Sequence, residues 1–351
     1  MKILHVVGAR PNFPKLAPVH RAGVARGLEQ VVVHSGQHYD DSMSGSFFES
    51  LGIPSPDVNL TVGSGSHAQQ TARIMERLEP VLLEHAPDWV VVYGDVNSTL
   101  AAAVVASKIG LRLAHVEAGL RSGDRTMPEE INRLVTDRLA SLLLTPSRDA
   151  DERLRAEGEP DEEIVFVGNV MVDTLLRAVA MSGLRRPDNL AADAPVVVTL
   201  HRPSNVDSVE RLAAIMQSLR EIARTRPVIF PAHPRTAAKL ADNGIATGGI
   251  QMLGPVAYEE MLALVMRSVA VVTDSGGIQE ETTVLGIPCL TLRDNTERPV
   301  TITEGTNQLV LDMAKIPALI ADLEKSPPTR RAPEGWDGQA GPRVIEALLV
   351  A

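Results

Sequence analysis

The chain has very little cysteine, and this scarcity bounds its chemistry. Cys289 is the one cysteine among 351 residues, so no disulfide can form within the chain. A protein without disulfides suits a reducing cytoplasm, which is where we expect this protein to work. Cys289 lies in an apolar run, and a lone cysteine in such a run is more often core filler than a nucleophile.

Long apolar runs and an excess of positive charge are missing as well. No apolar run approaches the roughly 20 residues of a membrane span. The opening stretch 1–7 is too short for a signal peptide and predicts a first strand. The net charge is −10, which argues against nucleic acid as the main partner. We therefore expect a soluble globular protein, without membrane or nucleic-acid partners, in which local groups hold any anionic ligand.

Two nucleotide-binding fingerprints are absent too. Gly8-Ala9-Arg10-Pro11 follows the first strand, but neither G-x-G-x-x-G nor G-x-x-x-x-G-K-[ST] occurs in the chain. These patterns mark tightly bound dinucleotides and ATP-type phosphates. Their absence argues against NAD and against ATPase chemistry, and we expect no cofactor.

What the chain does contain is a regular alternation of strand and helix patterns. This alternation predicts an α/β fold of two doubly wound, Rossmann-like domains with parallel sheets and a ligand cleft between them. We place the first domain at 1–182 and the second at 190–330, on either side of a polar, breaker-rich stretch. A terminal helix is predicted at 343–350, and it could pack back on the first domain.

The most informative segment runs from Asp274 to Glu281. The apolar run 268–273 predicts a buried strand, and a helix is predicted to begin at the glycines of Ser275-Gly276-Gly277. Glycines let a ligand approach the backbone, and free N–H groups at a helix start attract phosphate. We expect Glu281 in the first turn, beside hydroxyls next to that phosphate. An ordinary strand–helix turn is the alternative, but the polar segment 293–299 after the next strand favours a phosphorylated ligand.

Three carboxylates follow predicted strands or open a helix in the first domain: Asp95, Glu117 and Glu129. Alone, Asp95 could cap a helix and Glu129 could favour a helix dipole. Together beside one cleft, crowded carboxylates acquire different pKa values and can supply both an acid and a base. A metal site built from the same groups and His115 is disfavoured, because the spacing matches no compact ligand motif. We expect no metal.

Basic residues and a histidine stand at other strand ends. Arg10 and Lys15 follow the first strand, where they would suit a diphosphate if they face a cleft, or form a solvated loop if they do not. His201 ends the first strand of the second domain, and His233 stands similarly after the next. Either could be a hydrogen-bonded loop residue. We favour His201 for chemistry because an arginine and polar side chains follow it directly.

With these segments in view, the chain resembles the non-hydrolysing UDP-N-acetylglucosamine 2-epimerases, which have the two-domain glycosyltransferase-B (GT-B) architecture. The likeness covers nearly the whole chain and is most specific at 274–281 and 293–299. The resemblance implies reversible C2 epimerisation of UDP-N-acetylglucosamine to UDP-N-acetylmannosamine in a cytoplasmic homodimer. UDP leaves the anomeric carbon as a base removes the C2 proton, which gives a 2-acetamidoglucal to which UDP then adds back.

The resemblance also implies roles for individual residues. It makes Asp95, Glu117 and Glu129 acid/base carboxylates and His201 the catalytic histidine. It leaves open which carboxylate removes the C2 proton. The substrate-binding residues that it implies, for the diphosphate, the ribose and the sugar region, are Arg10, Lys15, Ser275, Gly276, Gly277, Glu281 and Arg298.

Departures from the family pattern keep alternatives open. The segment 125–127 looks short, as in relatives that act on archaeal UDP-N-acetylglucosamine or on UDP-2,3-diacetamido-glucuronate. Hydrolytic release of N-acetylmannosamine would use the same elimination. The intact acid/base set argues against a non-catalytic sensor. Retaining glycosyltransferases of this fold commonly carry two glutamates eight positions apart near the nucleotide, and the absence of such a pair at Glu281 argues against that activity. Tyr39 and Asp40 follow Gln37-His38, which predicts that no activating second UDP-N-acetylglucosamine is needed.

Overall fold

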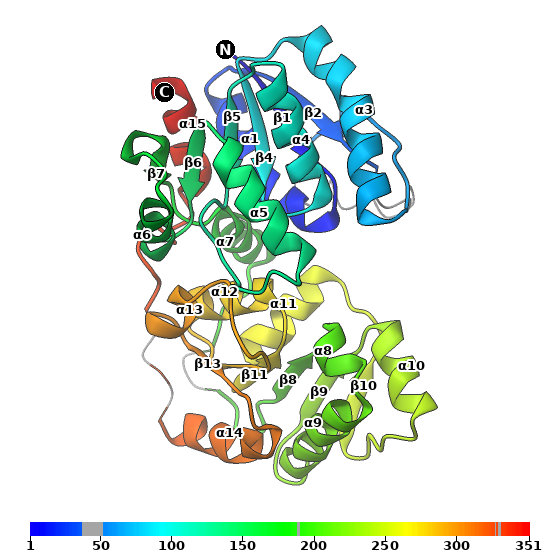
Figure 1. Cartoon of the computed structure of the whole chain (residues 1–351). Coiled ribbons are helices and arrows are strands. Elements are labelled where there is room, and N and C mark those ends of the chain that lie inside the picture. Colours follow the sequence, from blue (N-terminus) through cyan, green and yellow to red (C-terminus); the bar gives the residue numbers. More distant parts are fainter. Residues whose placement is uncertain (37–51, 188–189, 327, 329–330) are drawn as a thin grey trace. The chain divides into compact units, whose positions relative to one another are not determined.

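The computed structural model describes residues 1–36, 52–187, 190–326, 328 and 331–351, with the backbone alone of Arg10. The chain splits into two compact units (Figure 1). Unit 1 comprises Met1–Leu176 and Glu334–Ala351, and unit 2 comprises Arg177–Pro333. Over the described ranges, no helix combines the length and the apolar character that crossing a membrane requires.

Unit 1 is built on a seven-stranded sheet in which every pairing is parallel, in the order β3-β2-β1-β4-β5-β6-β7. The strands are β1 (Lys2–Val7), β2 (Glu29–His34), β3 (Val58–Asn59), β4 (Trp89–Tyr93), β5 (Leu113–Val116), β6 (Leu142–Thr145) and β7 (Ile164–Phe166). The helices are α1 (Phe13–Ala25), α3 (His67–His85), α4 (Asn97–Lys108), α5 (Pro128–Leu139), α6 (Arg148–Glu157), α7 (Val170–Ser182), which ends in unit 2, and α15 (Ala340–Val350).

Both faces of this sheet are buried, and the strand sequences show why. Ile3 and Val7 of β1 pack in one cluster with α1 and α15. Leu4 and Val6 of the same strand pack in another cluster with α3 and α4. Because side chains alternate between the two faces of a strand, a strand covered on both faces must be apolar throughout. The indole Nε1 of Trp89 also donates to the carbonyl of Leu348 at 3.1 Å, which fixes α15 in unit 1.

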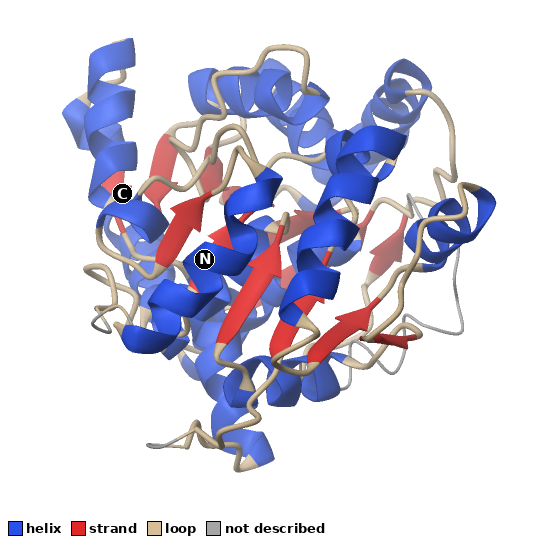
Figure 2. Cartoon of the chain, turned by 90° about the horizontal axis from the view of Figure 1, so that it is seen from below, coloured by secondary structure: helices blue, strands red, loops and turns tan. Residues whose placement is uncertain are grey.

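Unit 2 repeats this architecture with six parallel strands in the order β10-β9-β8-β11-β12-β13. The strands are β8 (Val196–Thr199), β9 (Val228–Pro231), β10 (Ile250–Leu253), β11 (Ala270–Thr273), β12 (Cys289–Thr291) and β13 (Asn307–Leu309). The helices are α8 (Pro203–Val206), α9 (Val209–Ile222), α10 (Pro234–Asp242), α11 (Tyr258–Arg267), α12 (Gly276–Leu285), α13 (Val300–Thr303) and α14 (Ile316–Lys325). Figure 2 shows strands in red with helices in blue around them.

Each sheet reverses its strand order at one point, between β1 and β4 in unit 1 and between β8 and β11 in unit 2. At such a point the connections leave towards opposite faces, so the carboxyl ends of the two strands form an opening where α/β proteins bind ligands. Candidate site residues follow all four of these strands: Lys15 follows β1, Asp95 follows β4, His201 follows β8 and Ser275 follows β11. They therefore lie where a ligand site is expected in each unit.

The predicted fold class, two Rossmann-like parallel α/β sheets, is confirmed, and the strands predicted within 1–7 and 268–273 are observed as β1 and β11. The edge strands β3 and β13 have only two and three residues, which are too few to show a periodic pattern in the sequence. The position of Glu281 was predicted wrongly. It is the sixth residue of α12, so it lies in the second turn of the helix and not the first.

Candidate functional site

In unit 1, Asn12 ties together the carboxyl ends of the two strands at the switch point. Its side-chain oxygen accepts hydrogen bonds from the backbone N–H groups of Gly8 (3.1 Å) and Ala9 (3.2 Å), just after β1. Its amide nitrogen donates to the carbonyl of Tyr93 at the end of β4 (2.9 Å). Asn12 thereby shapes the turn that continues into the short 3-10 helix Arg10–Asn12, where the backbone of Arg10 lies.

Lys15 and Glu117 form an ion pair between the first turn of α1 and the end of β5. Each residue is only 6% exposed. Gly94, which follows β4, makes room for the ammonium group, because a Cβ atom there would lie 2.6 Å from Lys15 Nζ. Glu117 has a φ of +76°, which is uncommon for a residue other than glycine and is often associated with functional sites. Its N–H donates to the carbonyl of Leu144 at 3.0 Å, which holds this conformation.

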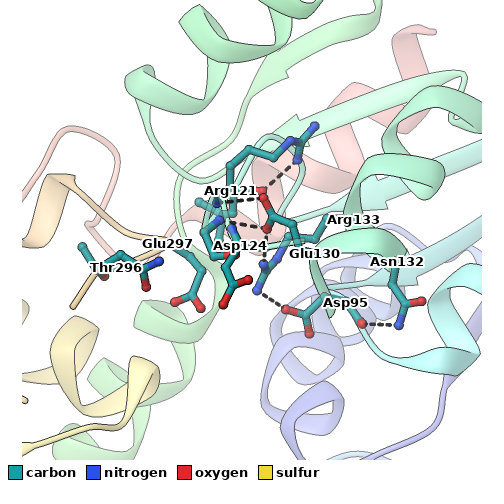
Figure 3. Close-up of polar contacts among 12 residues, drawn as sticks. Asp95, Arg121, Asp124, Glu130, Asn132, Arg133, Thr296 and Glu297 are labelled. Atoms are coloured by element: carbon teal, nitrogen blue, oxygen red, sulfur yellow. Dashed lines mark hydrogen bonds and ion pairs between the residues drawn. The ribbon is translucent and has the colours of Figure 1, made fainter. Parts of the chain in front are cut away.

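Asp95 is paired with Arg133 of α5 (Figure 3). The same guanidinium donates to Glu130 at 2.8 Å. Glu130 is 2% exposed and also accepts hydrogen bonds from the N–H groups of Ser122 (2.8 Å) and Gly123 (2.9 Å). Burial raises the pKa of Glu130, but these donors and Arg133 outweigh it, and the net shift is downwards. Glu130 is therefore a fixed anion that holds Arg133 against Asp95.

His115 holds the two carboxylate-bearing loops in place. Its Nε2 contacts the carbonyl of Gly94 at 2.8 Å, and its Nδ1 contacts Asp137 at 2.6 Å. Asp137 also accepts from the N–H of Gly119 (3.1 Å) and pairs with Arg121 (2.7 Å). Both ring nitrogens of His115 are thus engaged within the protein. Among the residues that the structure describes, no three histidine, cysteine or acidic side chains are grouped to hold a metal.

Glu129 differs from the other two carboxylates. It lies half-buried in the first turn of α5, directly before the anchored Glu130. Within the described part of the chain, its carboxylate makes no hydrogen bond or ion pair. Of the three carboxylates predicted to act on substrate, Asp95 and Glu117 therefore carry a cationic partner, whereas Glu129 has none among the residues that the structure describes.

In unit 2, His201 follows β8 and Asp274 follows β11, and the two side chains meet. Nδ1 of His201 lies 3.0 Å from Asp274 Oδ1. Asp274 is fully buried, whereas the His201 side chain is 53% exposed. The guanidinium Nε of Arg202 donates to the backbone carbonyl of Asp274 at 3.1 Å. His233, the other histidine considered, caps α10 instead, and its Nδ1 accepts the N–H of Arg235 at 3.2 Å.

The Ser-Gly-Gly turn leads into a helix, as predicted, and Arg298 lies against its start. Ser275 is the N-cap of α12, and its hydroxyl accepts the N–H of Ile278 at 3.5 Å. A Cβ atom on Gly276 would lie 2.9 Å from Arg298 Nη1, so glycine is what allows the guanidinium to approach. Helix-start N–H groups and a cation therefore lie side by side here, which is a favourable arrangement for phosphate.

Around Arg298 lies a network of buried ion pairs. Arg298 pairs with Glu280, and Arg293 donates two hydrogen bonds to Glu297 at 2.6 and 2.7 Å. Arg202 and Arg298 also lie 3.7 and 3.6 Å from Glu297. Burial raises the pKa of Glu297, but the neighbouring guanidiniums outweigh it and hold the pKa far below its usual range. Three arginines thus surround one carboxylate.

Glu281 accepts a hydrogen bond from the hydroxyl of Tyr258 at 3.0 Å. Burial, which outweighs that hydrogen bond, raises the pKa of Glu281 to about 7, and the nearby Glu280 adds to the rise. Tyr258 opens α11 and was not among the predicted site residues. Glu281 is therefore a buried carboxylate that titrates near neutral pH.

Sequence reasoning missed the partners of the acid/base groups. Arg133 received no role, although its spacing of three from Glu130 on a helix was a usable signal. Asp274 stood at the head of the most informative segment and also received no role. No local signal links Lys15 to Glu117. The predicted regulatory segment, Gln37–Asp41, lies outside the described residues.

Comparisons with known proteins agree over nearly the entire chain. Residues 21–349 match the family model described as UDP-N-acetylglucosamine 2-epimerase. The chain is 40% identical over 364 residues to the UDP-N-acetylglucosamine 2-epimerase of Methanocaldococcus jannaschii, covering 99% of each protein. It is 44% identical over 318 residues to the UDP-2,3-diacetamido-2,3-dideoxy-D-glucuronate 2-epimerase of Pseudomonas aeruginosa, covering 88% of each. The crystal structure of the Methanocaldococcus jannaschii enzyme in complex with UDP-GlcNAc and UDP matches with a TM-score of 0.89, 39% identity and full coverage of both chains.

Proposed function

Because the chain belongs to the UDP-N-acetylglucosamine 2-epimerase family, we propose that it interconverts UDP-N-acetylglucosamine and UDP-N-acetylmannosamine by inverting C2. The observation that carries the proposal is the pair of carboxylates Asp95 and Glu117, which follow the neighbouring strands β4 and β5 and each face a cation of their own. The family match extends across both units.

The reaction proceeds by loss and return of UDP. The C2 proton is not acidic in the resting sugar, and it becomes removable only as positive charge develops at C1. A base at C2 and stabilisation of the leaving diphosphate must therefore act in the same transition state. The intermediate is 2-acetamidoglucal, and re-addition of UDP after protonation on the opposite face gives the epimer.

Unit 1 supplies the acid/base carboxylates in this proposal. Asp95, Glu117 and Glu129 are the candidate proton carriers. The first two are held by Arg133 and Lys15, and Glu129 has no such partner among the described residues. Side chains held by ion pairs keep a defined geometry, whereas Glu129 is free to reorient on substrate. Removal and return of the C2 proton on opposite faces needs more than one such group.

Unit 2, which contains residues 190–330, binds UDP. Its support is the helix start at Ser275-Gly276-Gly277 with Arg298 beside it, which suits the diphosphate. Glu281 accepts from Tyr258 and, once ionised, can accept from ribose hydroxyls. His201 lies at the same edge of the sheet and contributes an imidazole ring. Arg10 is also a proposed ligand of the diphosphate.

The reaction needs neither a metal nor a nicotinamide cofactor in this proposal, and the enzyme works in the cytoplasm as a homodimer. Light scattering on the protein as it elutes from a gel-filtration column tests the oligomeric state, and a mass of one chain would contradict a dimer.

Treatment with EDTA followed by desalting tests whether a metal is needed. Full epimerase activity is expected to remain after this treatment.

Proton NMR in D2O tests the function directly. UDP-N-acetylglucosamine and UDP-N-acetylmannosamine are incubated separately with the enzyme, and UDP-2,3-diacetamido-glucuronate serves as the competing substrate. Both epimers are expected to accumulate with deuterium at C2. Epimerisation with full retention of the C2 proton would exclude elimination, and turnover of the diacetamido sugar alone would reassign the substrate.

A further inference from the structure

We propose that Asp274 is a positioning residue that fixes the proton of His201 on Nδ1 and so presents Nε2 to the substrate. This inference rests on the proposed function, because it concerns how His201 serves the epimerisation. It adds to the site a buried residue that does not itself touch the sugar.

The carboxylate of Asp274 is surrounded by hydrogen-bond donors. It accepts the backbone N–H groups of His201 (3.1 Å) and Arg202 (3.0 Å) and the side-chain amide of Asn205 (3.0 Å). A hydrogen on Oδ2 would point against the donors of Arg202 and Asn205. A hydrogen on Oδ1 would face Nδ1 of His201, which is the more basic group and takes the proton. The group is therefore an anion, which agrees with its lowered pKa. Burial alone would raise that pKa, but His201, Asn205 and the backbone outweigh it.

An ionised carboxylate can only accept hydrogen bonds. Since Nδ1 of His201 lies 3.0 Å from Asp274 Oδ1, Nδ1 must carry a hydrogen. In the neutral ring the lone pair then resides on Nε2. The side chain is about half exposed, so Nε2 is the ring atom available to a ligand.

The fold makes this contact rigid. β8 and β11 are neighbours in parallel register, with Thr199 opposite Thr273, and the hydroxyls of these two threonines lie 2.6 Å apart. Asn205 also donates to the carbonyl of Leu292 at 2.9 Å, which ties the end of β12 to the same carboxylate. Three strand ends therefore hold the acceptor for Nδ1 in one place.

The consequence is a defined proton path. Nε2 can exchange one proton with the substrate while the hydrogen on Nδ1 stays hydrogen-bonded to Asp274. The imidazolium that forms when Nε2 is protonated is offset by the carboxylate beside it. Fixing one ring nitrogen so that the other does the chemistry is a general way to orient a catalytic histidine.

His233 provides an internal control, because its hydrogen is expected on the other ring nitrogen. Its Nδ1 accepts a backbone N–H, so its neutral ring must carry the hydrogen on Nε2. The two histidines, in corresponding places after β8 and β9, are expected to be opposite tautomers in one molecule.

The test is nitrogen-15 NMR of the full-length protein with labelled histidine, at a pH where the rings are neutral. The protein has nine histidines, and the spectra of His201→Asn and His233→Asn identify the two signals. We expect Nδ1–H for His201 and Nε2–H for His233. Nε2–H for His201 in the folded wild-type protein would overturn the proposal, whether or not the protein epimerises UDP-sugars.

Steady-state kinetics of the Asp274→Asn variant provide a second test of the role of Asp274. We expect kcat to fall by about 10²-fold or more, with the affinity for UDP within about threefold of wild type, because the carboxylate of Asp274 is fully buried and accepts from protein donors. A kcat close to wild type in a folded variant would overturn the role. If the variant does not fold, the tautomer in the wild-type protein decides. Absence of C2 deuterium exchange by wild-type enzyme would instead refute the proposed function.

Discussion

Replacing Lys15 by methionine separates two roles for this lysine. The sequence places Lys15 among the ligands of the sugar and diphosphate, whereas the structure pairs it with Glu117 in the interior of unit 1. Methionine keeps much of the length and volume of the side chain but removes the charge. The variant therefore removes the cation that lies against the buried carboxylate of Glu117.

The expected magnitude follows from burial. Breaking a buried ion pair on one side costs about 3–5 kcal/mol, whereas breaking an exposed pair costs about 0–1 kcal/mol. Both residues are 6% exposed, so the larger figure applies. In a domain of roughly 150–250 residues, each kcal/mol lowers Tm by about 2–4 °C, which gives a fall of about 6–20 °C. Turnover is expected to fall as well, because Glu117 loses its defined position.

Thermal and urea unfolding measure the stability, and calorimetric titration measures the affinity for UDP. Lys108→Met is a matched control, because Lys108 is exposed at the end of α4, and the change should stay within about 0.5 kcal/mol. The double variant Lys15→Met/Glu117→Gln removes both charges and should recover about 1–3 kcal/mol relative to additivity.

The reasoning would be refuted by a Lys15→Met variant that is destabilised by less than about 1 kcal/mol and binds UDP at least tenfold more weakly. That outcome would return Lys15 to the diphosphate, as the sequence predicts. An additive double variant would show that the two charges do not interact in solution.

Three further predictions concern the acid/base groups, the diphosphate site and Glu281. Isosteric removal of each acid/base side chain should lower turnover by about 10²-fold or more in a folded protein, and a near-normal rate would remove that residue from the mechanism. The variants are Asp95→Asn, Glu117→Gln, Glu129→Gln and His201→Asn. Ser275→Ala and Arg298→Ala should each weaken UDP binding by calorimetry, and unchanged affinity in both would place the nucleotide elsewhere. Because the folded pKa of Glu281 is raised to about 7, its contribution to stability is fully present below pH 4.5 and declines as pH rises through 7. Glu281→Gln should flatten that part of the unfolding profile, and an unaltered profile would show that Glu281 does not titrate there.

The amino-acid sequence by itself determined the architecture and the positions of most groups that carry chemistry. Continuous apolar runs such as Trp89–Tyr93 specify strands buried on both faces, and polar residues directly after them must lie at the carboxyl edge of a parallel sheet. Asp95, Glu117, His201 and Ser275 could be picked out in this way, because their placement depends only on where a strand ends.

The tertiary structure alone decided which of these groups are partners. Lys15 and Glu117 are about a hundred positions apart, and His201 and Asp274 more than seventy, so no local pattern links them. They meet because the strand order brings β1 beside β4, β4 beside β5 and β8 beside β11. Burial also depends on packing from every side, which is why the raised pKa of Glu281 and its hydrogen bond from Tyr258 could not be foreseen. Sequence specifies what each strand end carries, and the order of strands in the sheet decides which charges face one another.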